Sequence, residues 1–190
     1  MGDISFAQNE EFQRIIDRTS KFPETRFLFC TKNPARYLSL EFPDNCVLGA
    51  TIESDVIYSG TKAPSPMSRY KAMVQLKHLH KFISIEPVMK FDLSTMVYWM
   101  SRIGPEIVEI GGDNYGHGLP ESEPWQVWAL IKQLGKFVPR IIQKPGLDRI
   151  LGKVERCGLC GEVMIKIIGS MVCDNKTCQR YRQPVPKSRR

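Results

Sequence analysis

Short apolar runs alternate with amphipathic helical patterns through residues 3–144, and this alternation restricts the fold more than any other feature. Most runs carry apolar side chains on both faces, as strands do in a parallel sheet that helices cover. We expect six of them to be strands, at residues 3–7, 26–33, 46–54, 81–87, 107–113 and 139–144. Strand, helix, strand is typical of a parallel α/β fold, and alternation alone does not separate an open sheet from a barrel.

Four intervening stretches predict helices, at residues 9–22, 65–79, 92–103 and 122–137. Ser65 stands before Pro66, which is the order of a helix cap followed by a first-turn proline. Ser122 is expected to cap the last of these helices in the same way. The three tryptophans lie within the helical patterns, where packing is a more common role than ligand binding.

Polar residues recur where these strands pass into the following loops. In parallel α/β folds the carboxyl ends of the strands bind ligands, although caps and loop residues are also polar at such places. Asp113 is followed closely by His117, near enough to share a metal ion or a proton. The predicted ligand-facing rim consists of Lys32, Asn33, Thr51, Glu53, Glu86 and Asp113, with Lys144 at the last strand end.

Four cysteines near the C-terminus have the spacing of a metal site. Cys157 and Cys160 form CxxC, Cys173 and Cys178 form a wider pair, and the twelve residues between the pairs alternate like a short hairpin. Glycines beside the first pair permit the tight turns that aim backbone N–H groups at sulfur. This pattern predicts a zinc ribbon with four thiolate ligands, while the wider second spacing leaves iron open. Disulfides fit poorly with the cytoplasmic location expected of this chain.

Charge separates the chain into unlike parts. Of its 190 residues, 42% are hydrophobic and 25% charged, as in globular proteins. The start has no basic n-region, and no apolar run reaches the roughly 20 residues of a membrane span, so we expect a cytoplasmic protein. Residues 1–135 hold 14 basic and 16 acidic residues, a net of −2, whereas residues 136–190 hold 13 and 4, a net of +9. The basic end either binds nucleic acid or another polyanion, or is a solvated tail.

Six sequence blocks in order suggest a relationship. They are GDISF, FLFCTKNPARY, PDNCVLGATIES, KAPSPMSRY, KFISIEPVMKFDL and IGGDNYGHGLPE. Together they resemble the later part of an uncharacterised radical-SAM-like family of archaea, bacteria and phages, over about Gly2 to Leu151. The resemblance implies a partial TIM-like (β/α) barrel whose rim holds S-adenosylmethionine and an iron–sulfur cluster. Lys32, Asn33, Thr51, Glu53 and Glu86 would then face the cofactor or the substrate.

The family's CxxxCxxC motif is missing from this sequence, since Cys30 and Cys46 stand alone. The resemblance therefore implies that the cluster-bearing strands lie upstream of Met1 or on a partner chain, or that the open barrel edge self-associates. We expect a barrel part at residues 1–151, a zinc-ribbon segment at 152–182 and a basic tail at 183–190. Two functions follow. One is a radical-SAM-like subunit that supplies the half of the barrel facing S-adenosylmethionine and substrate. The other is a non-catalytic zinc module whose basic end binds nucleic acid or a protein.

Overall fold

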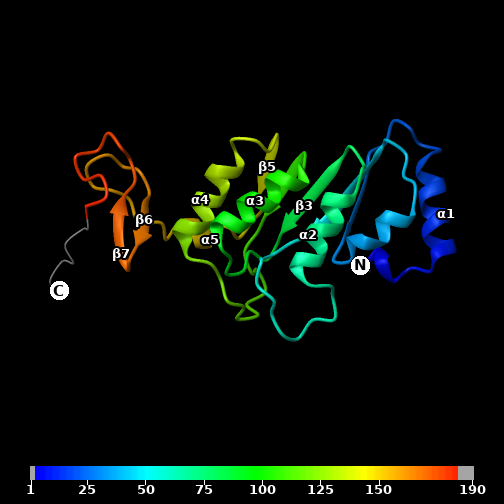
Figure 1. Ribbon diagram of the computed structural model, residues 1–190, viewed down its shortest axis with the longest axis horizontal. Helices are drawn as coiled ribbons and strands as arrows, with labels where there is room; N and C mark the ends of the chain where they lie inside the picture. The colour runs from blue at the N-terminus through cyan, green and yellow to red at the C-terminus, as the bar shows by residue number, and fades with distance from the viewer. Residues whose placement is uncertain (1–2, 184–190) are drawn as a thin grey trace.

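The computed structural model describes residues 3–183, and the basic tail predicted at 183–190 lies outside this range except for its first residue. The molecule is elongated, with a parallel sheet and its helices in the centre and a small two-stranded unit at one end (Figure 1). Within residues 3–183, no helix combines the length and the apolar character needed to cross a bilayer.

Five parallel strands form the main sheet, and they are added side by side in chain order. The strands are β1 (Phe27–Thr31), β2 (Cys46–Thr51), β3 (Lys81–Ile85), β4 (Ile107–Ile110) and β5 (Arg140–Gln143). The order β1-β2-β3-β4-β5 has no reversal, unlike that of a doubly wound sheet. The predicted parallel α/β class is confirmed. The five strands do not close on one another, so the described residues do not confirm a barrel.

Helices pack on one face of this sheet. They are α1 (Asn9–Thr19), α2 (Pro66–Gln75), α3 (Leu93–Ile103), α4 (Pro124–Leu134) and the short α5 (Asp148–Leu151), with a 3-10 helix η2 (Pro34–Ser39) between β1 and β2. Each α-helix contributes to a single apolar cluster that also contains Leu48, Ile83 and Val108 from the strands. Because side chains alternate along a strand, these strand residues share one face. In Figure 1, α2, α3 and α4 lie side by side over it.

The other face of the sheet carries the alternate strand residues and is partly exposed. Register places Cys30, Gly49, Phe82 and Ile107 in one row across it. The next row toward the carboxyl ends contains Thr51, Ser84 and Glu109. The sheet therefore has an apolar face under the helices and a second face that becomes polar toward its carboxyl edge.

Two local predictions were wrong. Residues 3–7 are not a strand, since Ile4–Phe6 forms a 3-10 helix, η1, whose first turn is capped by the Asp3 carboxylate accepting from the Ser5 N–H at 2.9 Å. Ser65 does cap α2, by accepting from the Ser68 N–H. The cap of α4, however, is Glu123, and the hydroxyl of Ser122 donates instead to the Met89 carbonyl at 2.9 Å.

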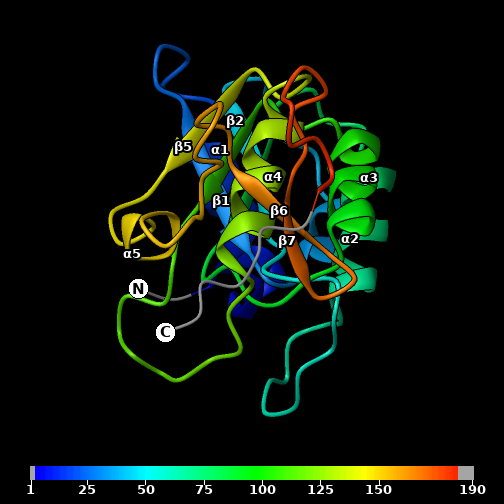
Figure 2. The ribbon, with the colours of Figure 1, turned by 90° about the vertical axis from the view of Figure 1, so that its left-hand side faces the viewer.

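The C-terminal unit is an antiparallel hairpin, as the alternation predicted. Strands β6 (Met164–Ile167) and β7 (Ser170–Cys173) pair across a tight turn. Both turn residues, Ile168 and Gly169, have positive φ, which is the geometry of a type I′ hairpin turn. The hairpin lies against α4 (Figure 2), and two ion pairs join them, Lys132–Glu162 and Lys166–Glu123.

Candidate functional site

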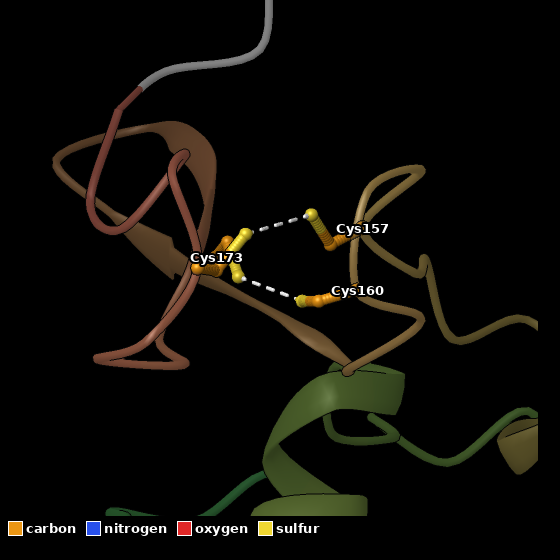
Figure 3. Close-up of side chains that lie close together, drawn as sticks. Cys157, Cys160 and Cys173 are labelled. Carbon is orange, nitrogen blue, oxygen red and sulfur yellow. Dashed lines mark hydrogen bonds between the residues drawn. The ribbon is translucent and has the colours of Figure 1, made fainter.

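The four cysteines of the C-terminal unit converge on one point. All four Sγ atoms lie within 4.8 Å of one another. Contacts join the two pairs: Cys157 Sγ lies 3.8 Å from Cys178 Sγ, and Cys160 Sγ lies 3.5 Å from Cys173 Sγ. Figure 3 shows Cys157, Cys160 and Cys173 converging. These separations are too long for disulfides. They fit a tetrahedral metal centre, because four sulfurs about 2.3 Å from zinc lie roughly 3.8 Å apart.

Local backbone geometry prepares these thiols for a metal. The N–H groups of Leu159 and Cys160 point at Cys157 Sγ and lower the pKa of that thiol to about 6. At Cys173 the Asn175 N–H favours the thiolate, but burial and the neighbouring thiols outweigh it and raise the pKa to about 12. One cysteine of the cluster thus ionises easily, while the crowded sulfurs resist further negative charge. A divalent cation would supply the missing positive charge and let all four ionise.

The donor set fits zinc better than a catalytic metal. Four thiolates fill a tetrahedral shell and leave no open position for substrate, as in structural zinc sites. Cys157 and Cys173 are buried, and the turn at Gly161 (φ 71°) brings the first pair back toward β6. In residues 3–183 these cysteines are the one group of His, Cys, Asp or Glu side chains whose arrangement could hold a metal ion. Their CxxC and CxxxxC spacings differ from the CxxxCxxC motif of radical-SAM clusters.

At the carboxyl ends of β1 and β2, three charged side chains form what we call the Glu53 network. Glu53 accepts from Arg69 Nη1 at 2.6 Å and from Lys32 Nζ at 3.1 Å. Arg69 is 1% exposed and also donates to the carbonyls of Thr51 and Pro64. A cleft of about 370 Å³ adjoins this network, between the loop after β2 and the segment after β3.

At the ends of β3, β4 and β5, a second set forms the Glu86 network. Lys144 Nζ lies 2.5 Å from Glu86 and 3.6 Å from Glu109. The hydrogen bond that Lys144 donates to the Glu86 carboxylate raises the pKa of Lys144, so the ammonium is held charged. Gly111 makes room for this contact, because a Cβ there would lie 2.7 Å from Glu86 Oε1. The following Pro87 is joined to Glu86 by a cis peptide bond.

The side chains of the remaining predicted rim residues join neither network. Asp113 accepts from the ring of His117 (Nδ1 to Oδ1, 2.9 Å). Desolvation acts to raise the pKa of Asp113, but this contact and neighbouring N–H groups outweigh it and lower the pKa. Thr51 Oγ1 lies 3.8 Å from Cys30 Sγ on the second face of the sheet. Asn33 donates its backbone N–H to Thr31 and lines a cleft of about 500 Å³ beside Asp3 and Lys32.

Sequence reasoning missed three contributors to this edge. Glu109 had a signal, since it stands two residues before Gly111 in a strand and therefore points to the same face. No sequence signal identified Arg69, because it lies in an amphipathic helix and comes close to Glu53 only in the folded structure. Asp3 accepts from Thr31 Oγ1 and from the Lys32 N–H, an anchor that only the tertiary structure reveals.

Together the two networks contain three cations and three carboxylates, so their formal charges balance. Such an edge suits a ligand that carries both charges, better than a simple anion or cation. Searches against protein-family models, curated proteins and solved structures found no match for this chain. The radical-SAM-like resemblance therefore stays a prediction from the sequence blocks.

Proposed function

We propose that residues 3–151 are the ligand-binding portion of a radical-SAM-like (β/α) barrel, and that they bind S-adenosylmethionine or its substrate at the carboxyl ends of β1–β5. Sequential parallel strands with every α-helix on one face are the arrangement of an arc of such a barrel. The observation that carries the proposal is the presence at this one edge of two networks whose charges balance when taken together.

S-adenosylmethionine matches the charges of the two networks. It carries an ammonium, a sulfonium and a carboxylate, so the carboxylates of Glu86 and Glu109 meet its cationic groups while Lys32 meets its anionic group. The cofactor's reductive cleavage takes an electron from an iron–sulfur cluster. Because the sequence has no CxxxCxxC motif and we assign its four clustered cysteines to zinc, we place the cluster ligands on a completing segment.

The completing segment has a suitable edge to join. β1 is the outer strand on one side of the sheet, and within residues 3–183 no further strand pairs with its outward N–H and C=O groups, which can therefore extend the ladder. A groove of about 820 Å³ runs between this strand and α1. Leu28 is 54% exposed beside it, and Ile15 of α1 is also exposed. A parallel strand from a second polypeptide would cover both side chains.

Calorimetric titration of the chain with S-adenosylmethionine tests the ligand site. Glu86→Gln should weaken binding at least about tenfold, since a hydrogen bond to a charged group contributes about 1.5–3 kcal/mol. Glu106→Gln, at the opposite ends of the strands, is the matched control and should bind as the wild type does. Absence of binding by the wild type, or equal affinities in all three proteins, contradicts the proposal.

A second function has its own observation, the charge of the zinc-ribbon unit. Residues 152–183 hold six basic and three acidic residues, a net of +3. Among the ion pairs of the described residues, none involves Lys176 or Arg180, so both remain available to a polyanion. We propose that this unit, held together by zinc, binds nucleic acid.

The salt dependence of binding tests this second function. The affinity for a labelled single-stranded DNA should fall steeply as salt rises, because each contacted phosphate releases counterions. Arg180→Gln should reduce the slope of log K against log salt by about 1. A salt-independent affinity, or none at low salt, overturns the nucleic-acid function.

A further inference from the structure

A cleft of about 440 Å³ lies between α4 and the zinc-ribbon unit. One wall is the face of α4 that carries Trp125 and Trp128, and the other includes Val163 and Ile165 of the ribbon. Figure 2 shows β6 lying in front of α4, so this space is formed only when the two units pack together. Small-molecule sites commonly have about 300–1,000 Å³ and often lie between units.

Trp125, which lines this cleft, has an unmet hydrogen-bonding need. Its indole Nε1 is buried without a partner, and no other buried side-chain nitrogen or oxygen of residues 3–183 is in that state. An indole N–H that is taken out of water normally finds an acceptor. A small adjustment around a ligand with an acceptor atom would satisfy it.

All but one of the charged side chains around the cleft are paired. Lys132 lies over the ring of Trp128 at 4.6 Å from its centroid and pairs with Glu162 at 3.7 Å. Across the cleft, Asp174 pairs with Arg182 at 3.5 Å, whereas Lys176 has no ion partner among the described residues. The interior therefore favours a neutral, flat ligand, and one cation remains free at its margin.

Amide side chains complete the lining. Gln133 of α4 and Asn175 of the second cysteine turn both face the cleft. Asn175 Oδ1 already accepts from Thr177, which leaves its NH₂ group as a donor. Aromatic surface combined with amide donors and acceptors is the chemistry that recognises an unpaired base, through stacking and hydrogen bonds to its edge.

We propose that this cleft binds one unpaired base of a single-stranded nucleic acid, and that Lys176 contacts a phosphate beside that base. The proposal rests on the nucleic-acid function proposed above for the ribbon and adds the site that reads the base. It also gives the zinc a second role, because the metal holds Asn175 and Lys176 against α4.

The test compares a short labelled single-stranded DNA with an abasic strand of the same length, using the zinc-loaded full chain. The two strands have equal phosphate charge and differ only in their bases. The normal strand should bind about tenfold more tightly or better, since stacking contributes about 1–3 kcal/mol per base. In a Trp99→Phe variant the remaining tryptophans are both in the cleft, and their fluorescence should be quenched by the normal strand alone.

Two variants separate the site from general charge. Trp125→Phe keeps a ring and removes the N–H, and it should reduce the preference for the normal strand. Trp99→Phe is the matched control, because Trp99 stacks on Tyr70 away from the cleft and its loss should leave both affinities unchanged. Lys176→Gln should weaken both strands and reduce the salt slope by about 1.

The outcomes distinguish this inference from the function beneath it. Equal binding of the two strands, or an unchanged preference in Trp125→Phe, overturns the base site while nucleic-acid binding stands. No binding of either strand overturns both. Displacement of the DNA by a basic peptide that itself quenches the two cleft tryptophans would reassign the cleft to a peptide side chain and also overturn the base site.

Discussion

The two parts of this molecule are held together by different means. In the α/β part, 26 buried residues form one apolar cluster that every α-helix shares with the sheet. In the ribbon the corresponding cluster has three buried members, Cys157, Met164 and Cys173, and two of these are proposed metal ligands. We expect a unit with so small a core to depend on a bound metal ion, whereas the sheet depends on packing. The difference teaches that one chain can contain two units with separate conditions for folding.

Removing the metal should have the largest effect and should break only one side of this comparison. With a chelator, or in Cys173→Ser, the ribbon is expected to lose its structure because three thiols and a small core cannot hold the hairpin. Hydrogen exchange should show full loss of protection in β6 and β7 and unchanged protection in β2, β3 and β4.

A matched control is Cys46→Ser, which changes a thiol that is not near the cluster. The Cys46 thiol lies in the α/β part, and its Sγ forms a hydrogen bond with Thr19 Oγ1 at 3.4 Å. The metal content of the Cys46→Ser variant should equal that of the wild type. Loss of the sheet's protection upon chelation would contradict the separation of the two units.

Much of the fold could be predicted from the sequence because its signals are local. The apolar runs at β2 and β3 are buried on both faces or nearly so, and such runs identify covered parallel strands. Residues 3–7 had a similar composition, but the Asp3 carboxylate accepts a hydrogen bond from the Ser5 N–H and caps the 3-10 helix η1 in place of a strand. Closure of the sheet depends on strands, edges and partners, and alternation contains no information about these.

The candidate sites also differ in how much of each could be predicted from local sequence signals. Cysteine spacing alone predicted which four cysteines come together as a possible metal site, because a site of this type is built from two short turns and a hairpin. The rim prediction named Glu53 and Glu86 but missed Arg69 and Glu109, which complete their networks. Contacts between residues far apart in sequence arise only from packing, so a single sequence does not predict them.

The next largest effect should come from the buried ion pair of the α/β part. Glu53→Gln leaves the guanidinium of Arg69 buried without its carboxylate, which should cost about 3–5 kcal/mol in the free energy of unfolding. Urea denaturation followed by tryptophan fluorescence measures this change. Glu162→Gln, which removes an exposed ion pair of the ribbon, should cost less than about 1 kcal/mol. Equal losses of unfolding free energy in Glu53→Gln and Glu162→Gln would show that burial does not make an ion pair of this chain more costly to break.

A smaller effect should follow from adding one methyl group to the sheet. In Gly49→Ala the new Cβ would lie 2.4 Å from Phe82 Cδ1 and 3.0 Å from the Phe29 carbonyl oxygen. Overpacking of this kind costs about 1–3 kcal/mol, measured as a lower urea midpoint. Gly158→Ala in the ribbon is the control, because its Cβ would meet no atom within 4 Å. Retained stability in Gly49→Ala would mean that the sheet yields at this point more readily than its packing suggests.

The smallest expected effect is a pH dependence specific to the α/β part, at the amino ends of its strands. Glu106 accepts from His80 Nδ1 at 2.8 Å and pairs with Arg26. Burial acts to raise the pKa of this carboxyl, but the two hydrogen bonds outweigh it and lower the pKa below the usual 4.5. The folded state therefore binds this proton less readily than the unfolded state. The resulting stabilisation is complete above about pH 4.5 and is lost as the pH falls through the lowered value.

Because Arg26 is exposed, this contribution should stay below about 1 kcal/mol. Urea midpoints measured between neutral pH and pH 3 should fall less steeply in Glu106→Gln than in the wild type. The comparison is best made in a zinc-free Cys173→Ser background, where metal release from the ribbon no longer contributes to the acid response. Identical slopes in the two proteins would place the acid sensitivity of the sheet elsewhere, with Asp3 as the next carboxyl to change. Its pKa is also lowered: burial acts to raise it, but hydrogen bonds from Thr31, Lys32 and Ser5 outweigh that effect.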